Sequence, residues 1–243
     1  FVLMKSADNS IHTAIEKSID GKSIEYLGFS NSEKICSARK NLLDLFKDRN
    51  SDEQSKYKLQ ADMMYFESKR LAQMERNFQS GGLSAGAARA NAEREIIGTY
   101  KQAGRLLETA TFIADRHPDK SLSPFRMSAA CAEQIISHAA RPTEIDQGLH
   151  PSCSVATLEV RTYSRHPSAA ARMVADFATN LSYSSSKSKI GVPVDRESIL
   201  SHQDSAHFVP RESQRGIASQ IFQVGAYNLM YRIGAPNLVF KQE

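Results

Sequence analysis

The chain of 243 residues has no tryptophan and only three cysteines, Cys36, Cys131 and Cys153. The cysteines are odd in number, widely spaced and without a CxxC pair, so we expect no disulfide framework, no metal site and no cofactor. Unpaired thiols favour a reducing compartment, but the sequence does not identify one. Apolar runs are only a few residues long, far short of the roughly 20 residues of a membrane-spanning helix. We therefore expect no membrane interaction.

Neither sign of charge dominates the sequence, which has 31 Lys and Arg against 27 Asp and Glu. Charged residues make up 24% and apolar residues 41%, proportions that exclude a collagen-like, wholly disordered or membrane-bundle protein. A nucleic-acid interface needs clustered positive charge, whereas this small excess is spread along the chain. The composition predicts a globular, helix-rich protein that does not bind nucleic acid.

Hydrophobic periodicity predicts a helix from Asn31 or Ser32 to about Lys47 and a helical hairpin over about 51–116. In the first arm of the hairpin, apolar residues recur every seven positions, at Tyr57, Met64, Leu71 and Phe78. Gly81 and Gly82 interrupt this arm, and the second arm begins near Ser84. We interpret the seven-residue repeat as the core of the hairpin. The outer surface of the hairpin is a candidate site for a protein partner.

Proline marks the helices that we expect in the second half of the chain. One helix runs from Phe125 to Ala140. It ends before Arg141 because Arg141 precedes Pro142, and a residue before proline disfavours helical geometry. Another helix starts at Pro167, since proline suits the first helical turn. A third spans about 214–233, and the serine-rich stretch 181–190 is predicted to be a loop.

One short stretch, residues 146–157, carries most of the chemical information. Breakers and a histidine precede Cys153, after which apolar residues resume. If Cys153 opens a helix, the unpaired N–H groups of the first turn and the helix dipole favour its thiolate, the nucleophilic form. Gln147 on the preceding loop would then stabilise the oxyanion that forms when a carbonyl is attacked. The β-branched residues of 153–163 also allow a strand, which would remove this effect, and a buried core thiol is the alternative role for Cys153.

This stretch resembles the active-site entry of papain-like cysteine peptidases, whose pattern is Asp/Asn-Gln-Gly, three variable residues, Ser-Cys and a helix. Asp146-Gln147-Gly148 and Ser152-Cys153 match the pattern in identity and spacing. The family has Trp after the cysteine, where this chain has Ser154. The resemblance covers about a dozen residues. It implies that Cys153 is the nucleophile, Gln147 the oxyanion-hole donor, and a peptide or protein the substrate.

A cysteine hydrolase also needs a histidine as base and an Asn or Asp that orients it. In papain-like enzymes both lie more than a hundred residues after the cysteine, whereas 90 residues follow Cys153 here. We therefore expect the catalytic His and Asn to lie beyond Glu243, in a longer protein of which this chain is a fragment. The alternatives are His207, paired with Asn228 in a compact transglutaminase-like site, and His166.

These observations predict a mainly α fold with two parts. Residues 1–120 form a helical region with the long hairpin, and 121–243 form a thiol-hydrolase domain, the first part of a papain-like α+β domain truncated at its C-terminus. The predicted function is hydrolysis of peptide or amide bonds through Cys153. The alternative is a helical protein-interaction module without catalytic activity.

Overall fold

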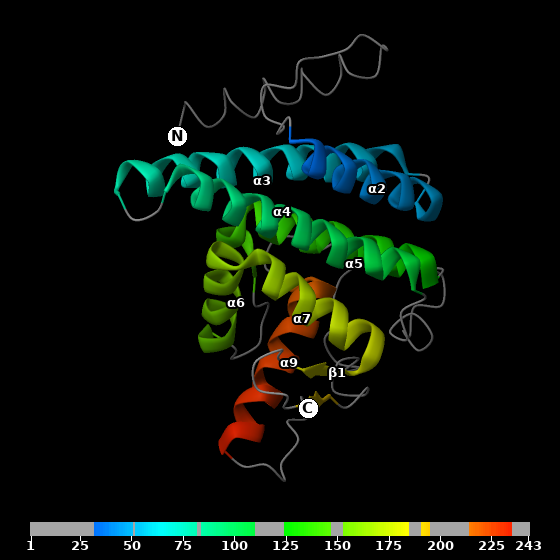
Figure 1. Ribbon diagram of the computed structural model, residues 1–243. Coiled ribbons are helices and arrows are strands. Elements are labelled where there is room, and N and C mark those ends of the chain that lie inside the picture. Colours follow the sequence, from blue (N-terminus) through cyan, green and yellow to red (C-terminus); the bar gives the residue numbers. More distant parts are fainter. Residues whose placement is uncertain are drawn as a thin grey trace.

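The computed structural model describes residues 32–50, 52–81, 84–109, 124–146, 153–184, 191–194 and 214–234. These residues confirm the mainly α fold, with a two-stranded sheet beside the helices (Figure 1). The helices are α2 (Glu33–Arg49), α3 (Glu53–Gln79), α4 (Ala85–Glu108), α5 (Pro124–Ala140), the 3-10 turn η2 (Pro142–Glu144), α6 (Cys153–Arg165), α7 (Pro167–Asn180) and α9 (Ile217–Gly234). No helix in the described part of the chain is long and apolar enough to cross a membrane.

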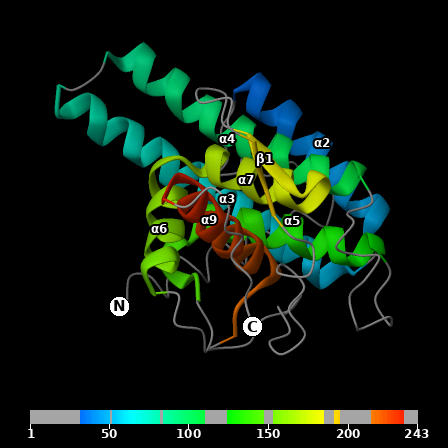
Figure 2. The ribbon, with the colours of Figure 1, turned by 90° about the horizontal axis from the view of Figure 1, so that it is seen from below.

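Helix α4 lies at the centre of the molecule and contacts α2, α3, α5 and α7. Helices α2 and α3 lie on one side of it, and α6, α7 and α9 lie on the other (Figures 1 and 2). Apolar side chains from all seven α-helices merge into one buried cluster. This cluster includes residues from both sides of position 120, and the division into two domains stays a prediction.

Local signals in the sequence set several helix ends. Asp52 accepts a hydrogen bond from Ser55 N at 3.0 Å, and Ser84 accepts one from Ala87 N at 3.3 Å, as N-cap residues do. Helix α5 ends before Arg141 and Pro142, and α7 starts at Pro167, as predicted.

Helix α7 obtains its N-terminal cap from another helix. His166, at its N-cap position, makes no side-chain cap bond. Instead, Glu95 of α4 accepts hydrogen bonds from the backbone N–H of Ser168 at 3.0 Å and from its hydroxyl at 2.7 Å. A carboxylate beside the first turn satisfies an unpaired N–H and suits the positive end of the helix dipole. This contact fixes the start of α7 against α4.

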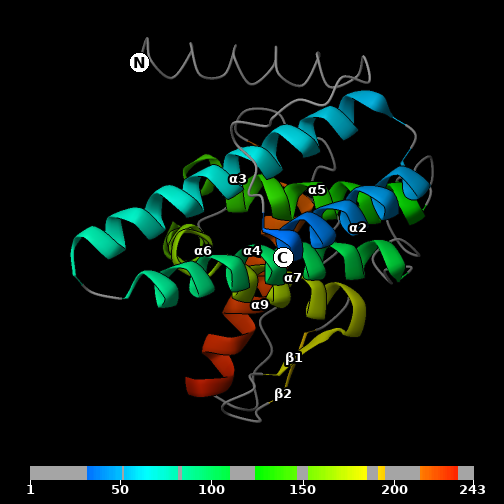
Figure 3. The same cartoon turned by 45° about the horizontal axis from the view of Figure 1, so that its top comes forward.

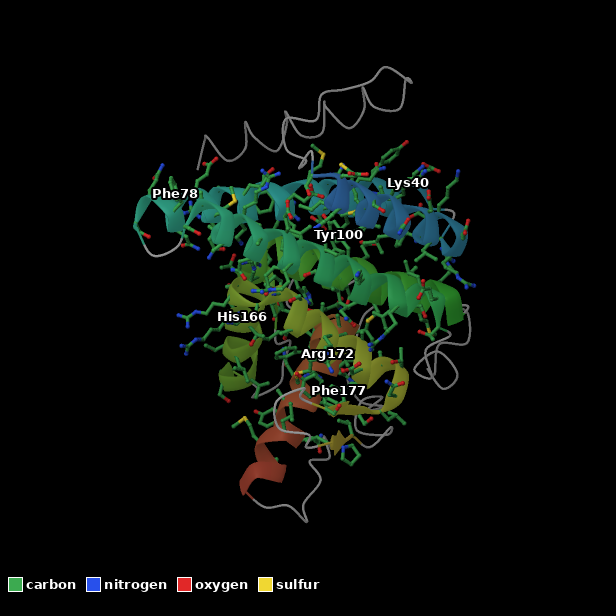
Figure 4. The ribbon with its side chains drawn as sticks, in the orientation of Figure 1. Lys40, Phe78, Tyr100, His166, Arg172 and Phe177 are labelled. Atoms are coloured by element: carbon green, nitrogen blue, oxygen red, sulfur yellow. The ribbon has the colours of Figure 1, made fainter. Side chains whose placement is uncertain are left out.

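The seven-residue repeat of α3 is only partly in the core. Met64 is 4% exposed, whereas Phe78 is 52% exposed, and Tyr57 and Leu71 are half-buried. The C-terminal end of α3 and the N-terminal end of α4 extend past the other helices (Figure 3). The repeat therefore continues beyond the body of the protein, and Phe78 lies exposed at the projecting end of α3 (Figure 4).

The loop predicted at 181–190 is wrong for its first residues. Ser182–Ser184 form strand β1, which pairs antiparallel with β2 (Gly191–Pro193), and Tyr183 lies opposite Val192. Leu181 ends α7 in the left-handed region with φ 54°, and its carbonyl accepts a bond from Val194 N at 2.8 Å. The chain reversal at Leu181 thus joins the end of α7 to the small sheet.

Candidate functional site

Cys153 is the first residue of α6 and its side chain is exposed. The helix start at Cys153 is confirmed, and the alternative strand over 153–163 is wrong. The β-branched residues fit the helix because Thr157 and Thr162 donate their hydroxyls to the carbonyls of Cys153 and Leu158, each at 2.7 Å. A threonine in a helix often makes this bond one turn back. The alternative that Cys153 is a buried core thiol is likewise wrong.

The other two cysteines differ from Cys153 in their surroundings. Cys131 of α5 is buried, and burial raises the pKa of its thiol to about 12. Cys36 is exposed on α2, where Arg39 Nη2 lies 3.9 Å from its sulfur. Cys153 is therefore an exposed thiol on the first residue of α6, and Cys36 is an exposed thiol on the fourth residue of α2, beside Arg39.

The remaining predicted site residues do not come together with Cys153 in the described part of the chain. Gln147 and His207 lie outside the described residues. His166 follows the last residue of α6 (Figure 4). It is about 20 Å along the helix axis from Cys153, at 1.5 Å per residue. His166 therefore cannot accept a proton from this thiol.

A buried polar cluster lies under the middle of α6. Glu159 is fully buried and accepts hydrogen bonds from the Ser219 hydroxyl and the Gln223 amide of α9, each at 2.9 Å. The Nδ1 atom of His138, on α5, lies 3.5 Å from Glu159 Oε1. The ring of His138 also packs edge-on against Tyr163, with 5.4 Å between ring centroids. These contacts join α5, α6 and α9.

Burial shifts the pKa values of Glu159 and His138 so that the neutral form of each side chain is favoured. Desolvation raises the pKa of Glu159 to about 7, an effect that the Gln223 and Ser219 hydrogen bonds only partly oppose. Desolvation also lowers the pKa of His138 to about 3. At mildly acidic pH the carboxyl group of Glu159 is therefore protonated and the imidazole of His138 is neutral.

Arg215 completes the cluster at the start of α9. Its guanidinium donates to Gln220 at 3.0 Å and to Gln223 at 3.3 Å, and its side chain is buried. Gln134 of α5 accepts a bond from Ala218 N at 2.9 Å and so caps α9. The sequence did not lead us to predict this cluster. The feature of the sequence that indicates it is glutamine on the apolar face of a helix.

The described residues contain no group of three or more His, Cys, Asp or Glu side chains that could hold a metal ion. The chain matches no protein-family model, no curated protein and no solved structure. A function for this protein therefore has to be argued from its own residues.

Proposed function

We propose that this chain carries the nucleophile of a thiol hydrolase that acts on peptide or amide bonds. The observation that supports the proposal is the position of Cys153, an exposed thiol on the first residue of α6. First-turn N–H groups of a helix have no partner inside the helix, and they stabilise negative charge at its start. The match of residues 146–153 to the papain-like entry pattern supports the same role.

In the proposed reaction the Cys153 thiolate attacks the carbonyl carbon of the substrate. A carbon–sulfur bond forms, and the carbonyl oxygen becomes an oxyanion that Gln147 would stabilise. The carbon–nitrogen bond then breaks, and the leaving amine takes the proton that the base removed from the thiol. Water hydrolyses the thioester, which releases the acid and restores the thiol. His207 is the candidate base within this chain.

The packing of α6 suits the support of a nucleophile. Val155 and Tyr163 are buried, and Glu159 is bonded to α9, so that the inner face of the helix is held along its length. A catalytic side chain needs such a rigid base to keep its geometry. Cys153 is the first residue of this anchored helix.

Alkylation across pH tests whether Cys153 is an activated thiol. We expect iodoacetamide to modify Cys153 at pH 6 about tenfold faster than Cys36, measured by mass spectrometry of each cysteine-containing peptide. Cys36 is the internal comparison because it is also exposed; since Arg39 Nη2 lies 3.9 Å from its sulfur, a faster reaction of Cys153 is the more stringent result. If both thiols react with the profile of an ordinary cysteine, with a midpoint near pH 8.5, the proposal is overturned.

A matched pair of variants tests the role in catalysis. A peptidyl vinyl sulfone is expected to label the wild-type protein and C36S, and not C153S. Equal labelling of C36S and C153S would show that the probe reads thiol exposure alone. Such a result would support the second candidate function, a helical interaction module. The exposure of Phe78 at the projecting end of the α3–α4 hairpin (Figure 4) favours that candidate.

A further inference from the structure

The outer face of α6 joins the candidate nucleophile to two positive charges. We call this face the α6 strip; its exposed residues are Cys153, Ser154, Thr157, Leu158, Arg161 and Arg165. The buried residues of the helix, such as Glu159 and Tyr163, lie on the opposite face, since successive residues of an α-helix are about 100° apart. Cys153 is at the start of the strip, and the two arginines are at its end.

The arginines of the α6 strip are not neutralised within the described part of the chain. Neither Arg161 nor Arg165 makes an ion pair there. Helix α6 makes its main contacts with α5, η2, α7 and α9, and α9 has no acidic residue. The acidic residues of the other three elements lie 2.6–3.9 Å from a basic side chain, in the pairs Glu133 with Lys58, Glu144 with Arg141, and Asp176 with Arg105 and Arg172. The one acid of α6, Glu159, is fully buried.

This charge favours carboxylates on a peptide as the partner of the α6 strip. A guanidinium donates two parallel N–H bonds to a carboxylate, which makes arginine the usual residue for its recognition. A single-stranded nucleic acid fits less well, because its bases stack on aromatic side chains and the α6 strip has none.

The length of α6 sets the distance between these carboxylates and the thiol. Arg161 lies about 12 Å and Arg165 about 18 Å along the helix axis from Cys153, at 1.5 Å per residue. An extended peptide advances about 3.3 Å per residue. The two distances therefore correspond to about four and about five peptide residues.

We propose that the α6 strip binds an acidic segment of the substrate, with Asp or Glu about four and five residues from the bond that Cys153 attacks. The peptide lies along α6 over Thr157 and Leu158, and Arg161 and Arg165 position it. The inference rests on the proposed function for the reaction at Cys153. The binding itself depends only on the charges and the exposed thiol of α6.

Affinity labelling of Cys153 tests this proposal without any need for catalysis. The probe is chloroacetyl-Gly-Ser-Gly-Glu-Glu-amide; a second probe has its chloroacetyl group at the C-terminal end, so that the acids precede it. The thiolate attacks the CH₂ carbon, a carbon–sulfur bond forms, chloride leaves, and the thiol proton passes to the buffer. The C36S protein is used, because Cys131 is buried and Cys153 is then the exposed cysteine of the described chain.

Mass spectrometry measures the labelling rate of Cys153. In one of the two directions we expect the Glu-Glu probe to react about fivefold faster than its Gln-Gln counterpart at about 20 mM salt, as for two exposed ion pairs. The difference is expected to fall below about twofold at 0.5 M salt, because exposed charges are screened.

Reversing the charge of the α6 strip separates binding from a structural role. In R161E/R165E we expect a Lys-Lys probe to react faster than the Glu-Glu probe, a reversal that a structural role would not produce. K40E is the matched control, because Lys40 is exposed on α2, far from α6 (Figure 4), and the wild-type preference should remain. Each rate is divided by the iodoacetamide rate of the same variant, which corrects for any change in the thiol, and circular dichroism checks the fold.

Three results would overturn the proposal. The first is equal rates for the Glu-Glu and Gln-Gln probes in both directions. The second is the same loss of preference in K40E as in R161E/R165E, which would indicate non-specific attraction. The third is stronger protection of Cys153 by oligothymidylate than by a glutamate peptide of the same charge, which would assign the strip to nucleic acid.

The labelling result is independent of the test of the hydrolase. If the charge preference reverses in R161E/R165E while Cys153 alkylates as an ordinary thiol, the strip binds acidic peptides and only the proposed hydrolase is wrong. If Cys153 is activated but shows no charge preference, only the present inference is wrong.

Discussion

Two fully buried glutamates, Glu67 of α3 and Glu159 of α6, are stabilised in opposite ways. Glu67 accepts two N–H bonds from the Arg39 guanidinium, at 3.0 and 3.1 Å, and one hydroxyl bond from Tyr100 at 2.9 Å. A bidentate arginine supplies a positive charge and two directed donors to the buried carboxylate. The α2–α3–α4 side of the molecule is thus joined by charge compensation.

Among the described residues, the side chains that donate hydrogen bonds to Glu159 are those of Ser219 and Gln223, and neither is charged. Its pKa is raised to about 7, and the neighbouring His138 stays neutral because its own pKa is lowered to about 3. At the α5–α6–α9 junction, Glu159 therefore keeps its proton at mildly acidic pH, and the charge of the cluster is on Arg215, which bonds Gln220 and Gln223. The comparison shows two ways of burying a carboxyl group: Glu67 lies against a guanidinium, and Glu159 has a pKa that desolvation raises to about 7.

The largest expected effect comes from removing the charge partner of Glu67. R39L leaves the carboxylate buried without its guanidinium, and the free energy of unfolding is expected to fall by about 3–5 kcal/mol. Urea denaturation at pH 7 measures this change. K40L, at the neighbouring exposed position, is expected to change the stability by less than about 0.5 kcal/mol. A loss below about 1 kcal/mol in R39L would show that Glu67 does not depend on the arginine.

Replacing either member of the second pair is expected to produce opposite pH dependences. A carboxyl pKa raised from 4.5 to about 7 stabilises the fold at low pH, and this stabilisation is lost as the pH rises through that range. A histidine pKa lowered from 6.5 to about 3 contributes the opposite slope, since the folded protein then binds fewer protons than the unfolded chain. Between pH 4.5 and 6.5 the two slopes cancel in the wild-type protein.

In H138Q only the Glu159 slope remains, and the free energy of unfolding is expected to fall by roughly 3 kcal/mol between pH 4.5 and 7. In E159Q only the His138 slope remains, and stability is expected to rise by roughly 3 kcal/mol from pH 4.5 to 6.5. Denaturation series at several pH values measure the slopes, which do not depend on any uniform loss of stability. Parallel curves for the two variants would contradict the assignment of the proton to Glu159.

The smallest effects compare one hydrogen bond at each glutamate. Y100F removes the hydroxyl bond to Glu67 and is expected to cost about 2 kcal/mol at any pH from 5 to 8, as for a bond to a charged group. S219A removes the hydroxyl bond to Glu159 and is expected to cost about 1 kcal/mol at pH 6, where the carboxyl is neutral. Above pH 7 this cost is expected to rise toward that of Y100F. Equal costs at pH 6 would mean that both carboxyls carry the same charge.

The sequence predicted much of the fold and part of the candidate site. The end of α5 and the start of α7 follow from Pro142 and Pro167, whereas the sequence left a helix and a strand open at Cys153, and the structure has the helix. The seven-residue repeat of α3 predicted a core that reaches Phe78, whereas Phe78 lies beyond the packed body. A repeat places a residue on one face of a helix, but it carries no information on where the neighbouring helix ends.

By itself, the sequence determined the helices, because caps, prolines and hydrophobic periods act between residues a few positions apart. Only the tertiary structure decided which carboxylates are buried and what compensates them. Arg39 and Glu67 are 28 positions apart, and Glu159 and Ser219 are 60 apart. The desolvation that shifts a pKa depends on every helix packed around the group. The sequence therefore identifies the candidate nucleophile, and the packing of the helices sets the pKa values of the buried groups around α6.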